Sequence, residues 1–158
     1  MNVTIIAVGK LKESYLRDGV MEYTKRLTPY ARVNIVEVSE ERLGDSPSPA
    51  EVEAALNAEG ERIISKIPKG SFVIPMCIEG EELSSPNFAK KIEKISLTNS
   101  SITFIIGSSF GLSRQVKEKA NFKFSLGKLT LPHQLARLVL LEQIYRAFSI
   151  LNNSKYHK

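Results

Sequence analysis

The chain has 158 residues, of which 42% are hydrophobic and 25% are charged, and this composition indicates one globular domain over residues 1–158. No apolar run approaches the ~20 residues of a membrane-spanning helix, and the first residues lack the basic start and cleavage site of a signal peptide. We therefore expect a cytoplasmic protein without a membrane partner, and the net charge of +5 permits, but does not require, a nucleic-acid partner.

Apolar β-type runs alternate with helical periodicity along the whole chain. The predicted order is a strand over 3–8, a helix over 11–27, a strand over 32–38, a helix over 50–67, a strand over 71–78, a helix over 87–97, a strand over 101–107, a short helix over 113–120, an extended stretch over 122–131 and a helix over 133–151. This alternation predicts the α/β class, with a mostly parallel sheet flanked by helices. In such sheets ligands bind beyond the carboxyl ends of the strands.

The third predicted strand, "SFVIPMCI", contains two residues of special interest. Pro75 indicates that the strand ends there or is irregular, because proline has no N–H for a central ladder. Cys77 is the single cysteine and cannot form an internal disulfide, which suits a reducing cytoplasm. Its apolar neighbours favour a buried structural thiol over a reactive one.

Glycine motifs separate several classes of nucleotide-binding protein. The stretch "VGKLKES" after the first strand has neither the Gly-x-Gly-x-x-Gly spacing of a dinucleotide site nor the Gly-Lys-Ser/Thr ending of a P-loop. A glycine-rich turn follows the fourth strand instead, as "IIGSSFGLS". Gly107 and Gly111 there serve either a tight strand-to-helix turn, with Ser113 capping the helix, or a loop that cradles a ligand.

The stretch "FSLGKLTLPH" (124–133) also allows two interpretations. It can wrap a flat, apolar ligand and offer its free backbone groups as hydrogen-bond partners. It can equally be an edge strand with a bend at Gly127.

The last helix has an apolar stripe that also contains a charge. The stripe consists of Leu141, Ile144, Phe148 and Leu151, and Arg137 lies on it one turn earlier. An arginine there is costly unless it is paired, faces an anionic ligand or reaches solvent along its stem. Glu142 and Arg146 form an i, i+4 pair on another side of the helix.

The two histidines, His133 and His157, both fall near the C-terminus. The chain ends "NNSKYHK", with an aromatic ring, an imidazole and an ammonium group, whereas a frayed terminus usually consists of small polar residues. Each histidine is either functionally silent or part of an active site.

Several segments together resemble one known family. "LTLPHQLARLVLLEQIYRAFSILNNSKYHK", the opening "VGKLKESYLRDGVMEYTKRLTPY", "LSSP" and "IIGSSFGLS" are similar to the RlmH family of SPOUT-superfamily methyltransferases, over the whole chain. The resemblance implies an S-adenosylmethionine-dependent enzyme that methylates N3 of a pseudouridine in helix 69 of 23S ribosomal RNA in the assembled ribosome. It also implies a C-terminal trefoil knot, which is a known exception to unknotted topology, and a homodimer without a metal.

The resemblance assigns site residues by position. The residues implied to contact S-adenosylmethionine are Met76, Gly107, Leu126, Gly127, Lys128, Leu129, Thr130 and Leu131. Those implied for the substrate and the chemistry are His133, Arg137, Glu142, Arg146, Tyr156, His157 and Lys158. One position departs from the family, which has Gly-Gly where this chain has Gly107-Ser108. If position 108 requires φ > 0, serine costs about 1 kcal/mol or more there and weakens cofactor binding.

Methyl transfer requires that the N3 proton be removed or accommodated, and a group that titrates near neutrality suits this task. We expect His157 to be the base or proton shuttle, with His133 and Glu142 as alternatives, and Tyr156 to stack on the flipped base. The seven residues after Leu151 can span roughly 25 Å. Two other functions remain open: a nonenzymatic ribosome- or RNA-binding relative with an impaired cofactor loop, and a SPOUT enzyme acting on transfer RNA. Saturable cofactor binding and substrate choice discriminate these from the main interpretation.

Overall fold

The computed structural model describes all residues from 1 to 158 and contains one five-stranded parallel sheet. The strand order is β2-β1-β4-β3-β5, with strands β1 (Asn2–Val8), β2 (Arg32–Val38), β3 (Phe72–Glu82), β4 (Ser101–Ile106) and β5 (Phe124–Ser125). The helices are α1 (Ser14–Leu27), α2 (Pro49–Ile64), α3 (Ser85–Ser96), α4 (Arg114–Glu118) and α5 (His133–Leu151). The predicted α/β class with a mostly parallel sheet is therefore confirmed.

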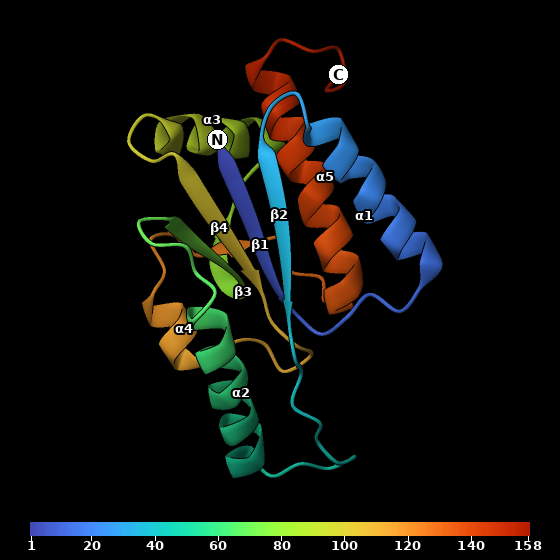
Figure 1. Cartoon of the computed structure of the whole chain (residues 1–158), viewed down its shortest axis with the longest axis vertical. Coiled ribbons are helices and arrows are strands. Elements are labelled where there is room, and N and C mark those ends of the chain that lie inside the picture. The colour runs from blue at the N-terminus through green and yellow to red at the C-terminus, as the bar shows by residue number, and fades with distance from the viewer.

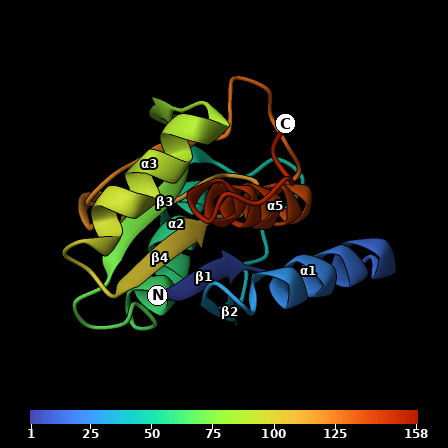
Figure 2. The same ribbon diagram turned by 90° about the horizontal axis from the view of Figure 1, so that it is seen from above.

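Two apolar cores lie on opposite faces of the sheet, because alternate residues of each strand point to opposite sides. Val3, Ile5 and Ala7 of β1 join the larger core, which α1, α3 and α5 cover. Ile6 and Val8 join the smaller core, which α2 and α4 cover. Helix α5 lies between α1 and α3 (Figures 1 and 2). β1 is consequently buried on both faces, as its continuous apolar run predicts.

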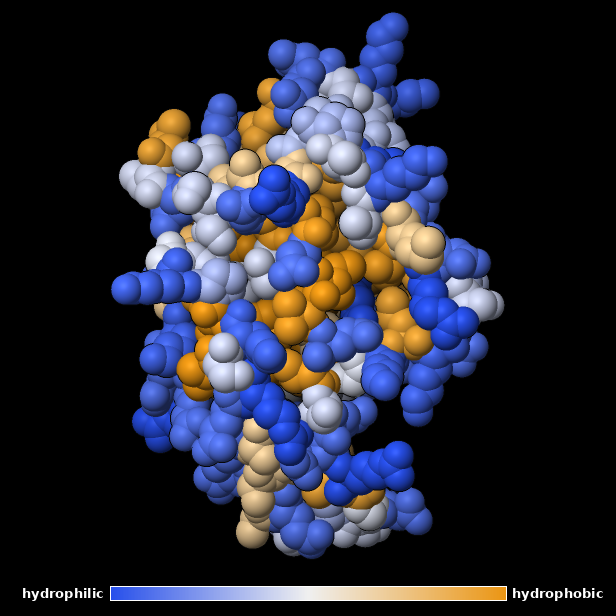
Figure 3. All heavy atoms as spheres, viewed as in Figure 1, coloured by the Kyte–Doolittle hydropathy of each residue, from blue (hydrophilic) through white to orange (hydrophobic).

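The surface view of the face in Figure 1 shows apolar side chains in the middle of the face and hydrophilic ones around its rim (Figure 3). The accessible surface is 9192 Å² for a chain of 17.6 kDa. A compact monomer of this mass exposes about 7,900 Å². The folded chain thus exposes more surface than its mass requires.

Serine side chains start three of the helices. Ser48 forms a capping box with Glu51, and Pro49 opens α2 as predicted. Ser84 accepts a hydrogen bond from the N–H of Asn87 at 3.2 Å, and Ser113 accepts one from Val116 at 3.2 Å. These hydrogen bonds satisfy backbone donors that have no partner inside a helix. Ser113 therefore caps α4, as the sequence indicated.

Several predicted elements differ in extent from those observed. The helix predicted over 50–67 ends at Ile64. The helix predicted over 11–27 begins only at Ser14. The stretch predicted as extended over 122–131 is a strand only at Phe124–Ser125 and a loop afterwards. The predicted edge strand is therefore present, as β5, but it ends before Gly127, which has φ +133 and lies in the loop that follows.

A further difference concerns β3, which continues to Glu82 instead of ending near residue 78. Pro75 is the last residue of β3 that pairs with β4, and the pairing with β5 then shifts register between Met76 and Glu81. The irregularity predicted at Pro75 thus begins at the next residue. Cys77 is half-buried here rather than buried, and burial raises the pKa of its thiol.

Candidate active site

The residues expected to hold the cofactor meet at one edge of the sheet. Met76 lies in β3, Gly107 follows β4, and the loop of residues 126–131 follows β5. β3 lies between β4 and β5, and Met76 pairs directly with Phe124. Three segments distant in sequence therefore come together where parallel α/β sheets bind their ligands.

The glycine loop after β4, residues 107–111, is tightly folded. A side chain at Gly107 would overlap the carbonyl oxygen of Gly111, and Ser108 forms an isolated bridge with Gly111. Gly111 has φ +90, whereas Ser108 does not have a positive φ. The backbone penalty considered for Ser108 is therefore absent, and this departure from the family pattern causes no backbone strain.

The loop of residues 126–131 is anchored at its start and open further along. The hydroxyl of Ser125 accepts a hydrogen bond from the N–H of Gly127 at 3.2 Å and donates one to the Gly127 carbonyl at 3.1 Å. Leu126 packs against the larger core, whereas Leu129 is 86% exposed. The backbone N–H groups of residues 128–131 make no hydrogen bond within the chain. They are free to bind a ligand.

The polar residues of α5 form two separate groups, and the first lies at the start of the helix. Arg137 is 1% exposed, and its Nη1 donates to Oε2 of Glu37 at 2.6 Å. Its Nη2 donates to the carbonyl of Gly9 at 3.3 Å. His133 is half-buried, and its Nε2 lies near Gly9. Of the three environments considered for Arg137, the structure contains the paired one.

The second group joins the end of α5 to the C-terminal tail. Arg146 donates to Oε1 of Glu142 from Nε at 2.9 Å and from Nη2 at 2.5 Å. The Tyr156 hydroxyl donates to the same oxygen at 3.2 Å, and Nη1 of Arg146 lies 3.1 Å from Nδ1 of His157. Lys158 is exposed at the chain end. The structure therefore brings four of the predicted substrate residues together, and the tail is not frayed.

Two residues of α1 and one of α5 complete this second group and were not predicted. The Tyr23 hydroxyl lies 3.4 Å from that of Tyr156, and the guanidinium of Arg26 lies 5.1 Å from the Tyr23 ring. The Tyr145 ring meets that of Tyr156 at 4.7 Å. Burial and the hydrogen bond to Tyr23 raise the pKa of Tyr156 well above its ordinary value. Tyr156 is therefore a hydrogen-bond donor at neutral pH and not a base.

A single chain does not bring the tail to the cofactor loops. His133 and Arg146 are thirteen positions apart on one helix, which corresponds to about 20 Å. In Figure 1 the C-terminal tail lies at the top, whereas the carboxyl ends of β1 and β4 point downward. The predicted catalytic residues thus fall into two groups near opposite ends of α5.

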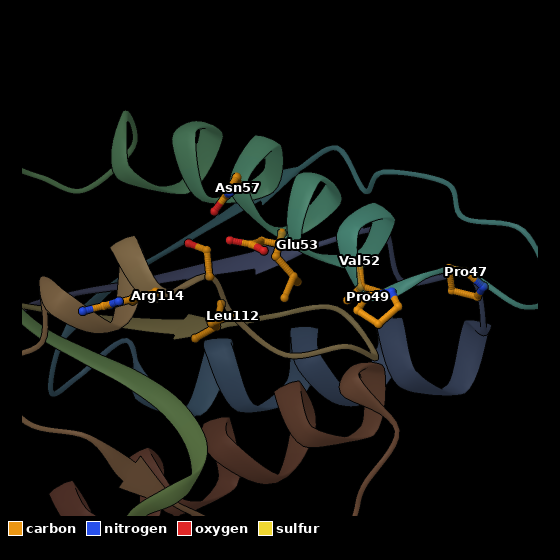
Figure 4. Close-up of a pocket in the computed structure, with 9 residues that line it drawn as sticks. Pro47, Pro49, Val52, Glu53, Asn57, Leu112 and Arg114 are labelled. Carbon is orange, nitrogen blue, oxygen red and sulfur yellow. The ribbon is translucent and has the colours of Figure 1, made fainter.

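Two hollows flank α2 near the carboxyl ends of the strands. One, of about 410 Å³, lies between α2 and the residues around Leu112, with Glu53 and Arg114 at its sides (Figure 4). The other, of about 390 Å³, lies between residues 40–44 and residues 108–110, and its wall includes Glu59. None of the predicted site residues lines either hollow. The structure also has no cluster of His, Cys, Asp or Glu suited to a metal, and no helix long and apolar enough to cross a membrane.

Comparisons with known proteins identify relatives over the full length of the chain. The family described as "Predicted SPOUT methyltransferase" matches residues 1–157. Two relatives named "Ribosomal RNA large subunit methyltransferase H" match over the full length of both chains. They come from Carboxydothermus hydrogenoformans, at 55% identity, and Streptococcus gordonii, at 53%.

Two solved structures share the fold at low sequence identity. The tRNA (m1G37) methyltransferase from Aquifex aeolicus has a TM-score of 0.53 and 14% identity, over 92% of this chain and 70% of its own. A probable methylase family protein from Haemophilus influenzae has a TM-score of 0.50 and 14% identity, over 98% of this chain and 67% of its own. From these matches and the geometry above, the chain belongs to the SPOUT methyltransferases, in the family of ribosomal RNA large subunit methyltransferase H.

Proposed function

We propose that this protein transfers a methyl group from S-adenosylmethionine to N3 of a pseudouridine in helix 69 of 23S ribosomal RNA, on the assembled ribosome in the cytoplasm. The observation that carries the proposal is the set of free backbone N–H groups in residues 128–131, in the loop after β5, together with the half-buried Met76 of the neighbouring strand β3 and the tight turn at Gly107 after β4. The full-length relatives, whose names refer to large-subunit ribosomal RNA, support the substrate.

The residues at this edge of the sheet fit S-adenosylmethionine. An adenine ring requires apolar walls and partners for its polar edge. Met76 and Leu126 supply apolar surface, and the backbone of residues 128–131 supplies donors. Gly107 lets the loop after β4 fold back tightly onto Gly111. The bound cofactor supplies an electrophilic methyl group on its sulfonium sulfur, and the chain contributes mainly by positioning the two reactants.

His157 is our candidate for the group that takes the N3 proton. Arg146 has only donors, so Nδ1 of His157 accepts in their 3.1 Å contact and Nε2 carries the hydrogen of the neutral ring. In this arrangement His157 donates a hydrogen bond instead of accepting a proton. The proposal therefore requires RNA to release Nδ1 from Arg146, for example when a phosphate takes over that guanidinium. His133 and Glu142 are the alternatives.

The remaining tail residues suit RNA binding. Lys155 and Lys158 are exposed and can neutralise phosphates, together with Arg146. The ring of Tyr156 has Arg146 on one face at 4.7 Å and can offer a stacking surface to a flipped base.

We further propose a homodimer in which the tail of one protomer completes the cofactor site of its partner. The tail and the cofactor loop of residues 126–131 adjoin opposite ends of α5, and the tail reaches at most roughly 25 Å from Leu151. The accessible surface beyond that of a compact monomer and the apolar area in Figure 3 support a second copy. The trefoil knot that the family implies stays a prediction.

Isothermal titration of S-adenosylmethionine into the purified protein tests the cofactor, and we expect a dissociation constant in the micromolar range. Transfer of a labelled methyl group is then compared on 70S ribosomes, isolated large subunits and bulk transfer RNA, all from cells that lack this modification. Label in 70S ribosomes alone supports the proposal. Label in transfer RNA would refute the substrate, and absence of binding at millimolar S-adenosylmethionine would favour an RNA-binding relative without activity.

A tail variant tests the role of His157. His157→Ala should retain cofactor binding and lose at least ~100-fold in the rate of methyl transfer, which is the lower range for loss of an acid–base group. Lys66→Ala, at an exposed lysine after α2, is the matched control and should keep the wild-type rate. Unchanged transfer in His157→Ala would remove His157 from the chemistry.

A further inference from the structure

Glu59 and Gly60 are consecutive residues in the C-terminal half of α2, and both are buried. Neither belongs to the residues assigned so far to cofactor or substrate. Glu59 is only 3% exposed, which is rare for a carboxylate unless it has partners. Its partners all lie in the loops at the carboxyl edge of the sheet.

The carboxylate of Glu59 joins two loops that follow different strands. Its Oε2 accepts a hydrogen bond at 2.9 Å from the N–H of Glu41, in the loop after β2. Ser108, in the glycine loop after β4, lines the same hollow as this carboxylate, and its side chain faces it. Burial raises the pKa of Glu59, and the hydrogen bond from Glu41 and the neighbouring Ser108 side chain partly oppose the rise. Glu40 and Arg62 are the other charged groups that face it, and their effects are smaller.

Gly60 packs against Ser113, at the end of the segment that runs from Ser108 to the start of α4. A Cβ at this position would overlap the Ser113 hydroxyl and would lie 3.2 Å from its Cβ and 3.4 Å from Cγ2 of Val116. Ser113 caps α4, so the α2 backbone approaches the start of α4 as closely as a helix allows. Glu59 thus faces Ser108, and Gly60 packs against Ser113.

We propose that Glu59 is a positioning residue that holds the glycine loop, residues 107–111, in the conformation that binds S-adenosylmethionine. The proposal rests on the function proposed above, since it requires Gly107 to contact the cofactor. Without the carboxylate, the N–H of Glu41 loses its acceptor and Ser108 loses its polar neighbour, so the loop becomes free to leave this conformation. The apparent dissociation constant rises in inverse proportion to the competent fraction, so a fall to about one tenth weakens binding about tenfold.

Calorimetric titration of S-adenosylmethionine into matched variants tests this inference. Glu59→Leu fills a similar volume without an acceptor and should bind about tenfold more weakly, with a raised KM for the cofactor and a nearly unchanged kcat. Glu59→Gln should stay within about threefold of wild type, because its amide still accepts from Glu41 and can donate to Ser108. Glu53→Ala, an exposed position on the same helix, is the control and should bind as wild type does.

A double-mutant cycle separates positioning from general stability. Ser108→Ala should weaken binding on its own, and it should add nothing further in the Glu59→Leu background, because both act through one contact. The inference would be overturned if the two substitutions weakened cofactor binding additively. It would also be overturned if folded Glu59→Leu bound S-adenosylmethionine with wild-type affinity. If Glu59→Leu does not fold, Ser108→Ala decides: wild-type affinity with unchanged hydrogen exchange over residues 107–113 would overturn it. Wild-type protein that binds no cofactor would instead refute the proposed function.

Discussion

The ion pair between Arg137 and Glu37 predicts a large loss of stability when its carboxylate is removed. Arg137 is 1% exposed, and in Glu37→Ala its guanidinium would keep only the Gly9 carbonyl at 3.3 Å. Removing one partner of a buried pair typically costs about 3–5 kcal/mol. Because the Glu37 side chain is 37% exposed, solvent screens part of the interaction, and we expect about 2–3 kcal/mol.

Urea and thermal unfolding followed by circular dichroism measure this loss, at one fixed protein concentration because a dimer's stability depends on it. For a chain of this length the expected loss lowers the midpoint temperature by about 4–12 °C. Adding Arg137→Met to Glu37→Ala should recover most of it, since an apolar residue then fills the buried site. Glu118→Ala, which breaks an exposed pair with Arg114, should cost less than about 0.5 kcal/mol.

The outcome also decides what Arg137 does. A loss below about 1 kcal/mol in Glu37→Ala, or a double variant less stable than the single one, would refute the structural account. Arg137 would then have to be maintained for a ligand, as the family resemblance implies. A loss of about 2–3 kcal/mol would instead show that Arg137 stabilises the fold. It does so by joining α5 to the end of β2, through Glu37, and to the turn after β1, through Gly9.

Three further predictions concern α2 and the tail. Because the pKa of Glu59 is raised in the folded state, the free energy of unfolding of the wild type falls as the pH rises above the unfolded pKa of about 4.5. Urea unfolding of Glu59→Gln at a series of pH values above 4.5 should show a smaller fall in this free energy. Gly60→Ala places a methyl group against Ser113 and should cost about 1–3 kcal/mol in the same assay. Tyr156→Phe should leave the pH profile of methyl transfer unchanged, because this hydroxyl stays protonated throughout the neutral range.

The order of strands and helices was predictable because both periodicities are strong in this chain. β1 is apolar at nearly every position, and only burial on both faces tolerates such a run. The start of α1 was not predictable, because distant contacts hold the residues before it. The N–H of Leu11 donates to Glu37 at 3.3 Å, and Arg17 donates to the carbonyl of Lys12 at 3.0 Å. Leu11 and Glu37 are 26 positions apart, so the periodicity of a short stretch of sequence cannot reveal their contact.

The cofactor loops could be located from sequence, because parallel sheets place their sites after the strands and two such loops contain glycine. Glu59 could not, because a glutamate among alanines in an amphipathic helix is ordinarily a solvated residue. The sequence contained one indication that this part of the helix is buried. Gly60 follows it in the helix interior, where glycine costs about 1 kcal/mol relative to alanine, and such a glycine indicates close packing. Only the fold identifies the packing partner as Ser113 at the start of α4.

The C-terminal tail is docked by contacts that RNA can exchange for its own. Tyr156 and His157 are half-buried, and their hydrogen bonds go to Glu142, Tyr23 and Arg146 at 3.1–3.4 Å. Each such bond contributes on the order of 1 kcal/mol at a partly exposed position. A phosphate bound by Arg146 replaces the contact with the imidazole of His157 by an ion pair between opposite charges. The same residues can therefore order the tail in the free protein and release it on RNA, which a rigidly buried tail would not allow.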